Sequence, residues 1–181
     1  MSDLPKMLQN KLEFCHFIDW IIVRRRVTSY LEIGSKYGGS LIRVAAAMPI
    51  GSKIVSVDLE GRDIWKQTTQ QLGKHWVAYG MKGDSTMPMM VKAVQLLGPF
   101  DVVFIDGGHD EATVRADWAN YGPMGKIIAF HDISWVKGTR DIVIDVPKVW
   151  AELKTQYRTK EYREEKTDNG IGVLFRDRPL R

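Results

Sequence analysis

The chain has 181 residues, of which 44% are hydrophobic and 27% are charged, and its formal net charge is +4. This length and composition fit one ordinary globular domain and exclude disordered, collagen-like and low-complexity chains. The single cysteine, Cys15, excludes an internal disulfide and a multi-cysteine zinc site.

The N-terminal segment has the spacing of a packing helix, because apolar residues recur at steps of three and four. Its predicted buried positions are Leu8, Leu12, Cys15, Ile18 and Ile22. We assign residues 1–26 to this helical segment and residues 27–181 to an α/β core, together one domain of residues 1–181. No apolar run reaches the roughly 20 residues of a membrane helix, and the start lacks a signal-peptide pattern, so we expect a soluble, cytoplasmic protein.

Strands and helices then alternate along the chain. The predicted strands are 30–33, 53–58, 76–81, 100–105 and 126–130, and the predicted helices are 41–48, 64–72, 86–97, one around Val114 and Trp118, and one around Val149 to Leu153. Residues 157–175 have the pattern of a hairpin around Asp168-Asn169-Gly170. We therefore predict an α/β, Rossmann-like, doubly wound sheet of seven strands, mostly parallel, with a C-terminal antiparallel hairpin.

Polar residues gather just after the predicted strands, which is where ligands bind in open parallel sheets. These positions are residues 34–40, Asp58, residues 83–85, residues 106–109 and residues 131–132. Their side chains are mainly carboxylates, hydroxyls and imidazoles, and a purely structural sheet would not need so many acids at one edge.

The first of these positions is a glycine loop that differs from the dinucleotide-binding pattern G-x-G-x-x-G. Its spacing is Glu32-x-Gly34-x-x-x-Gly38-x-Ser40. An acid before the first glycine disfavours a pyrophosphate and suits a cationic ligand. Asp58, at the end of the second strand, can accept both hydroxyls of a ribose. The alternative is a plain tight turn, with Asp58 capping the next helix.

The motifs LEIGSKYGGS, IVSVDLE, GDS, FDVVFIDGGHDEATVRAD and IIAFHDI, in this order over residues 30–135, resemble those of class I S-adenosylmethionine-dependent methyltransferases. The similarity is greatest to the small O-methyltransferases of the catechol type and their sugar- and antibiotic-modifying relatives. It implies methyl transfer from S-adenosylmethionine to a small hydroxylated acceptor such as a sugar, a phenol or a natural product.

The resemblance also implies roles for individual residues. The implied cofactor-binding residues are Glu32, Gly34, Ser35, Gly38, Ser40, Asp58, Leu59, Asp84, Ser85 and Asp106. Glu32 and Gly34 would line the methionine part, and Ser40 would hold its carboxylate. Asp58 would bind the ribose, and Asp84 and Ser85 would meet the adenine edge.

Methyl transfer to oxygen requires that the acceptor hydroxyl lose its proton, either to a base or through a divalent metal. Asp106 and His109 are the predicted catalytic residues, with His109 as general base at the position of the catechol-type lysine. The relatives' metal ligands correspond to Asp106, His131 and Asp132. His131 stands where the relatives usually have a carboxylate, so several possibilities stay open. They are a Mg²⁺ or Mn²⁺ site, another softer metal, a site with only two protein ligands, and no metal.

Each histidine also has a structural alternative: His109 as a helix-start residue bonded to backbone, and His131 as a residue that orients Asp132. Trp135 and the loop of residues 134–145 are expected at the mouth of the crevice, where the loop would form a lid. The acceptor pocket could also come from the N-terminal helix or from the second subunit of a homodimer.

Two other functions are considered. The first is a nucleic-acid methyltransferase or binding module that uses the basic surface, but the sequence has no base-flipping motif. The second is a nicotinamide oxidoreductase, which the spacing of the glycine loop disfavours.

Overall fold

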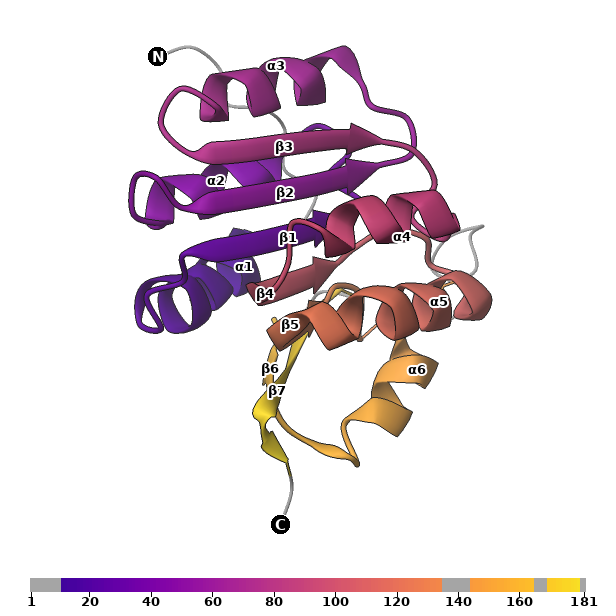
Figure 1. Ribbon diagram of the computed structural model, residues 1–181. Helices are drawn as coiled ribbons and strands as arrows, with labels where there is room; N and C mark the ends of the chain where they lie inside the picture. The colour runs from indigo at the N-terminus through magenta and orange to yellow at the C-terminus, as the bar shows by residue number, and fades with distance from the viewer. Residues whose placement is uncertain (1–10, 135–143, 165–168, 180–181) are drawn as a thin grey trace.

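The computed structural model describes residues 11–134, 144–164 and 169–179, and these form one seven-stranded sheet with helices on both faces (Figure 1). The strands are β1 (Ser29–Ile33), β2 (Lys53–Asp58), β3 (Val77–Lys82), β4 (Phe100–Ile105), β5 (Gly125–Phe130), β6 (Tyr157–Tyr162) and β7 (Ile171–Pro179). Their order is β3-β2-β1-β4-β5-β7-β6. β1 to β5 are parallel, and β7 pairs antiparallel with both β5 and β6. The predicted fold class is confirmed.

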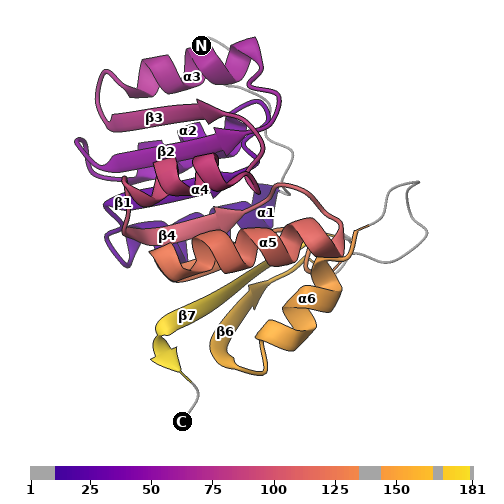
Figure 2. The same ribbon diagram turned by 45° about the vertical axis from the view of Figure 1, so that its right-hand side comes forward.

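The helices divide between the two faces of the sheet (Figure 2). The described helices are α1 (Lys11–Phe17), η1 (Ile18–Val23), α2 (Gly39–Ala47), α3 (Asp63–Leu72), α4 (Pro88–Gln95), α5 (Glu111–Tyr121), η2 (Gly122–Met124) and α6 (Val146–Leu153). α1, η1, α2 and α3 contribute to one hydrophobic core, and α4, α5 and α6 contribute to the other. Successive strand residues alternate between these cores, as Tyr30 and Leu31 do, so the central strands are apolar on both faces.

The N-terminal helix differs from its predicted form in two respects. It changes to a six-residue π-helix after Phe17, and Leu12 and Cys15 of the predicted buried face are exposed. Ile22 is buried as predicted and Ile18 is half-buried, and the other buried apolar side chains of this segment are Phe14, Phe17 and Ile21. Phe14 and Phe17 pack against Phe104 of β4, with ring centroids 6.0 and 5.4 Å apart respectively. Aromatic rings bury more apolar area than leucine or cysteine, so they decide which face meets the sheet.

Some predicted features lie outside the described residues. These are Leu8, Trp135, most of the expected lid and Asp168 of the hairpin turn. Within the described part of the chain, no helix is both long enough and apolar enough to span a membrane.

Asp101 connects three strands at the edge opposite the polar strand ends. Its Oδ2 accepts hydrogen bonds from the backbone N–H groups of Thr28 (3.0 Å) and Ser29 (3.2 Å), and Lys126 donates to its Oδ1 at 2.7 Å. Burial by itself would raise the pKa of Asp101, but the hydrogen bonds from Lys126 and Thr28 outweigh burial and lower the pKa to about 2. The ionised carboxylate therefore holds the starts of β1, β4 and β5 together.

Asp101→Asn is expected to lower the free energy of unfolding at pH 7 by about 1 to 2 kcal/mol, since charged hydrogen bonds are lost. Because the folded-state pKa is depressed, the contribution of Asp101 is present above its unfolded pKa near 3.9 and disappears as the pH falls toward 2. Chemical denaturation of both proteins between pH 7 and pH 2 should therefore show a difference that shrinks below pH 4. Asp63→Asn, in an exposed ion pair with Lys66, is the control and should change little. A difference independent of pH would contradict this role.

Candidate active site

A cavity of about 640 Å³ opens at the carboxyl ends of the parallel strands. It is lined by the loops that follow β1 to β5, as the positions of the polar residues predict. The sequence-predicted residues on its wall are Gly34, Ser35, Ser40, Asp58, Leu59, Asp84, Ser85, Asp106, His109, His131 and Asp132. Glu32 and Gly38 are not among the lining residues.

Gly34 allows the glycine loop to cross directly over the end of β4. Its φ is +88°, and a Cβ at this position would lie 2.1 Å from the backbone oxygen of Asp106. Its N–H donates to the carbonyl of Val57 at 2.8 Å, so the loop is also tied to β2. A side chain at this position is excluded, and the loop after β1 brings the ends of β2 and β4 to the same cavity.

Gly38 allows the left-handed backbone conformation that the chain adopts just before α2. It precedes α2 in a left-handed conformation, with a φ of +77°, and a Cβ at this position would be 3.0 Å from the Thr68 side chain. Gly38 therefore shapes the start of α2, whose first residues form the cavity wall.

Glu32 lies behind the cavity wall and is fully buried. Ser40 Oγ donates to its Oε1 at 2.5 Å, and the Tyr30 hydroxyl donates to its Oε2 at 2.8 Å. Burial raises the pKa of Glu32 to about 7; these hydrogen bonds oppose the rise, and the charge of Asp106 adds to it. The Ser40 hydroxyl, which we expected to hold the cofactor, is bound to Glu32 in this structure.

Asp58 is fixed at the rim of the cavity by backbone N–H groups. Lys36 donates to Oδ2 at 2.6 Å, and Glu60 and Gly61 donate to Oδ1 at 3.0 and 2.9 Å. The carboxylate thus joins the glycine loop to the turn after β2. Its position on the wall leaves it near any polar ligand that enters from that side.

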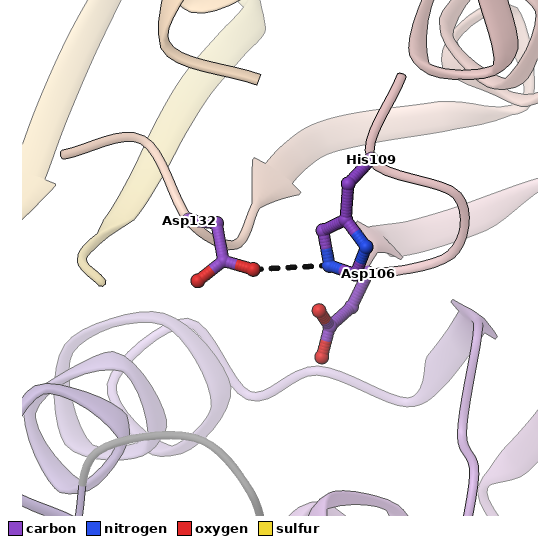
Figure 3. Close-up of side chains that lie close together, drawn as sticks. All are labelled: Asp106, His109 and Asp132. Carbon is purple, nitrogen blue, oxygen red and sulfur yellow. Dashed lines mark ion pairs between the residues drawn. The ribbon is translucent and has the colours of Figure 1, made fainter. Parts of the chain in front are cut away.

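Asp106, His109 and Asp132 come together at the other end of the cavity (Figure 3). His109 Nε2 lies 3.0 Å from Asp132 Oδ2, and this hydrogen bond is the main reason that the pKa of His109 is raised. Burial would raise the pKa of Asp132, but hydrogen bonds from His109 and His131 lower it strongly. Asp132 has a φ of +60°, an uncommon conformation for a non-glycine residue that is found often at functional sites.

His131 lies beneath this cluster, between three carboxylates. Its Nδ1 is 3.3 Å from Asp106 Oδ1 and 3.2 Å from Asp132 Oδ1, and its Nε2 is 3.3 Å from Glu13 Oε1. Although burial lowers the pKa of His131, these carboxylates outweigh burial and raise it. Acids thus lie near both nitrogens of His131, an arrangement that is compatible with the structural alternative in which this residue orients Asp132.

Glu13 was not singled out by the sequence analysis. It is 2% exposed, on the face of α1 that also buries Phe14 and Phe17. The sequence does place this acid close to two aromatic residues in a packing helix, which indicates that its side chain could be buried. Only the fold shows that its partner is His131, more than a hundred residues away.

The set of side chains that could hold a divalent cation differs by one residue from the predicted set. One ligand atom from each of Asp106, His109 and Asp132 lies within 4.8 Å of the others. His131, which the resemblance suggested as a ligand, also lines the cavity, but carboxylates lie near both of its nitrogens. Two carboxylates and one imidazole are a reasonable donor set for a divalent metal.

The sheet order, the glycine loop and the acids at the strand ends define a Rossmann-like methyltransferase fold. The chain belongs to the family described as "Methyltransferase domain", whose model matches residues 31–133. No curated protein sequence matches the chain significantly.

Solved structures with low sequence identity share this fold. An O-methyltransferase from Bacillus cereus, in complex with SAH (S-adenosylhomocysteine), is 16% identical over 95% of this chain and 84% of its own, with a TM-score of 0.73. The O-methyltransferase TomG from Streptomyces achromogenes, involved in tomaymycin synthesis and in complex with SAM (S-adenosylmethionine), is 13% identical over 97% and 83%, with a TM-score of 0.67. The methyltransferase MycE of mycinamycin biosynthesis, in complex with Mg, SAH and mycinamycin VI, is 15% identical over 91% and 48%, with a TM-score of 0.61.

Glu32→Gln is expected to stabilise the folded protein above neutral pH. Because the folded-state pKa of Glu32 is raised from 4.5 to about 7, its contribution to stability is complete below pH 4.5 and is lost as the pH rises to 7. The amide does not ionise, so the free energy of unfolding of the variant minus that of the wild type should grow between pH 5 and pH 8, by roughly 2 to 3 kcal/mol. Denaturation of both proteins across this range measures it, with the exposed Glu152→Gln as control. A difference that stays flat with pH would show that Glu32 is ionised throughout.

Proposed function

We propose that the protein is an S-adenosylmethionine-dependent O-methyltransferase that acts on a small hydroxylated acceptor such as a sugar, a phenol or a natural product. The observation that carries this proposal is that Asp58 and Asp106 line one cavity together with the glycine loop between β1 and α2. Family membership and the neighbours crystallised with SAH or SAM support the same cofactor.

The cofactor would extend along the strand ends from Asp58 to Asp106. Asp58 would bind the ribose, held in place by its three backbone N–H donors. Asp84 and Ser85 would meet the adenine, and Gly34 leaves the loop backbone open to the methionine part. Asp106 and Asp132 lie near the expected sulfonium, and carboxylates stabilise a positive charge in a partly enclosed cavity.

The reaction would be an in-line displacement at the methyl carbon. The acceptor oxygen forms a bond to the methyl group as the bond from carbon to sulfur breaks, and SAH leaves as a neutral thioether. The hydroxyl proton must go to a base. In a neutral His109 ring that donates from Nε2 to Asp132, the lone pair is on Nδ1, and this is the atom at which we place proton uptake.

Asp106, His109 and Asp132 are also the residues that would hold a divalent cation, as MycE was crystallised with Mg. Such a cation would lower the pKa of the acceptor hydroxyl. The cation would compete with the His109–Asp132 hydrogen bond, because both need the same side chains. Removing the cation with a chelator therefore distinguishes proton removal by His109 from proton removal assisted by a metal.

Wild-type protein is expected to bind S-adenosylmethionine in isothermal titration calorimetry, and Asp58→Ala is expected to weaken binding by tenfold or more because the ribose loses its carboxylate partner. Asp63→Asn, on the exposed side of α3, is the matched control and should bind as the wild type does. Circular dichroism of Asp58→Ala would establish that the variant is folded. No binding by the wild type, or undiminished binding by folded Asp58→Ala, would disprove the proposal.

Methyl transfer from labelled S-adenosylmethionine to a panel of sugars and phenols is expected to persist after treatment with EDTA, because His109 and Asp132 already form a complete proton-accepting pair. His109→Asn should reduce transfer at least a hundredfold, in the range typical of a lost general base. His75→Asn, outside the cavity, is the control. Loss of activity on chelation with recovery on adding Mg²⁺ or Mn²⁺ would instead assign proton removal to a metal at this cluster.

A further inference from the structure

Glu13 is a buried acid that the mechanism above does not use. It lies on α1, and its side chain is 0% exposed. Among the described residues, its carboxylate oxygens have no hydrogen bond of normal geometry, but Oε1 lies 3.3 Å from Nε2 of His131. Burying two such groups is costly, and an apolar residue of similar size would pack at this position at least as well. Packing alone therefore does not explain an acid here.

His131 connects this buried acid to the wall of the cavity. It directly follows β5 and lines the cavity, whereas Glu13 is not among the lining residues. The Nδ1 atom of His131 lies 3.3 Å from Oδ1 of Asp106 and 3.2 Å from Oδ1 of Asp132. The two nitrogens of one ring thus contact an enclosed acid on one side and two acids of the cavity wall on the other.

The contact with Glu13 distinguishes the two orientations of the His131 ring. Half a rotation about the bond from Cβ to Cγ exchanges Nε2 with Cε1 and Nδ1 with Cδ2. An ionised carboxylate only accepts hydrogen bonds, so Glu13 favours the orientation in which a nitrogen rather than a carbon faces it. The neighbouring ring of Phe104, whose centroid is 6.4 Å from that of His131, is apolar and favours neither orientation.

Glu13 differs from the other two acids around His131 because it is enclosed. Asp106 and Asp132 line the cavity, where an entering ligand can draw their carboxylates away from the ring. Glu13 stays against Nε2, since α1 is held on the sheet by its aromatic residues and leaves no solvent beside this acid. With Nε2 fixed in this way, Nδ1 continues to face the acids of the cavity.

Asp132 carries the effect of this orientation to the proposed base. Its Oδ1 is 3.2 Å from Nδ1 of His131, and its Oδ2 is 3.0 Å from Nε2 of His109 (Figure 3). One carboxylate is therefore held between two imidazoles. A reversed His131 ring would offer Cδ2 to Asp132 and leave that carboxylate free to turn, and the hydrogen-bond partner of His109 would then move.

We propose that Glu13 is a positioning residue, which holds the His131 ring in the orientation that directs Nδ1 toward Asp132. It thereby keeps Asp132 in place for its hydrogen bond with His109. This inference rests on the proposed function, because it concerns the base of the same methyl transfer. Glu13 acts from behind the cavity, since it is not part of the wall.

The test measures kcat with labelled S-adenosylmethionine and the most active acceptor of the sugar and phenol panel, and the Kd of S-adenosylmethionine by isothermal titration calorimetry. Glu13→Leu should lower kcat about tenfold or more, because no acceptor then faces Nε2. Its Kd should change by less than about twofold, since Glu13 does not line the cavity. Glu13→Gln keeps an acceptor oxygen at this position and should retain kcat within about threefold.

Two further variants separate positioning from packing. His131→Asn should lower kcat, and adding Glu13→Leu to it should cause no further loss, because Glu13 acts through His131. Ile21→Val, which changes only the apolar packing of the adjoining helix η1, is the control and should leave both kcat and Kd unchanged. Circular dichroism would establish that each variant is folded.

An unchanged kcat in folded Glu13→Leu would overturn the inference, and so would a further loss in the double variant. A loss in Glu13→Gln as large as in Glu13→Leu, or an equal loss in Ile21→Val, would count against it in the same way. If Glu13→Leu does not fold, Glu13→Ala removes the same carboxylate and takes its place in each comparison. Absence of methyl transfer by the wild type would refute the proposed function instead.

Discussion

The architecture of the cavity depends on the close approach between Gly34 and the backbone of Asp106. β1 lies between β2 and β4 in the sheet, so the loop after β1 must pass between the ends of its two neighbours. Only a residue without a Cβ fits where this loop crosses Asp106. The crossing brings the loop that holds Asp58 and the loop that carries Asp106 and His109 to opposite sides of one cavity.

Several carboxylates lie close together at the carboxyl ends of the strands, and the repulsion between their negative charges must be reduced. The surroundings of these carboxylates differ from one strand end to the next. Glu32 is shielded from solvent and has a raised pKa, whereas Asp106 and Asp132 face the ring of His131, with Glu13 on its other side. Asp58 accepts hydrogen bonds from three backbone N–H groups. Under the proposed function, a cationic ligand would be stabilised by the carboxylates that line the cavity.

The sites that could be predicted from sequence are those where a single strand end determines the position. Asp58 and Asp106 end buried strands, so their places on the cavity wall followed from the parallel sheet. Ser40 and Glu32 differ, because their mutual hydrogen bond depends on how α2 packs over β1. His109 and His131 both line the cavity, and tertiary packing decides what each of them contacts. The packing of α1 places Glu13 beside Nε2 of His131, whereas Nε2 of His109 meets Asp132.

The amino-acid sequence by itself determined the alternation of strands and helices, the antiparallel closing hairpin and the edge of the sheet where polar residues gather. These are set by local patterns of apolar residues, glycines and turns, which act over a few residues. The tertiary structure alone decided the partners of the charged groups, such as Glu13 with His131 and Asp101 with Lys126. Such pairs join residues distant in the chain, and their energies depend on burial and on distances of a few ångströms that no local pattern contains.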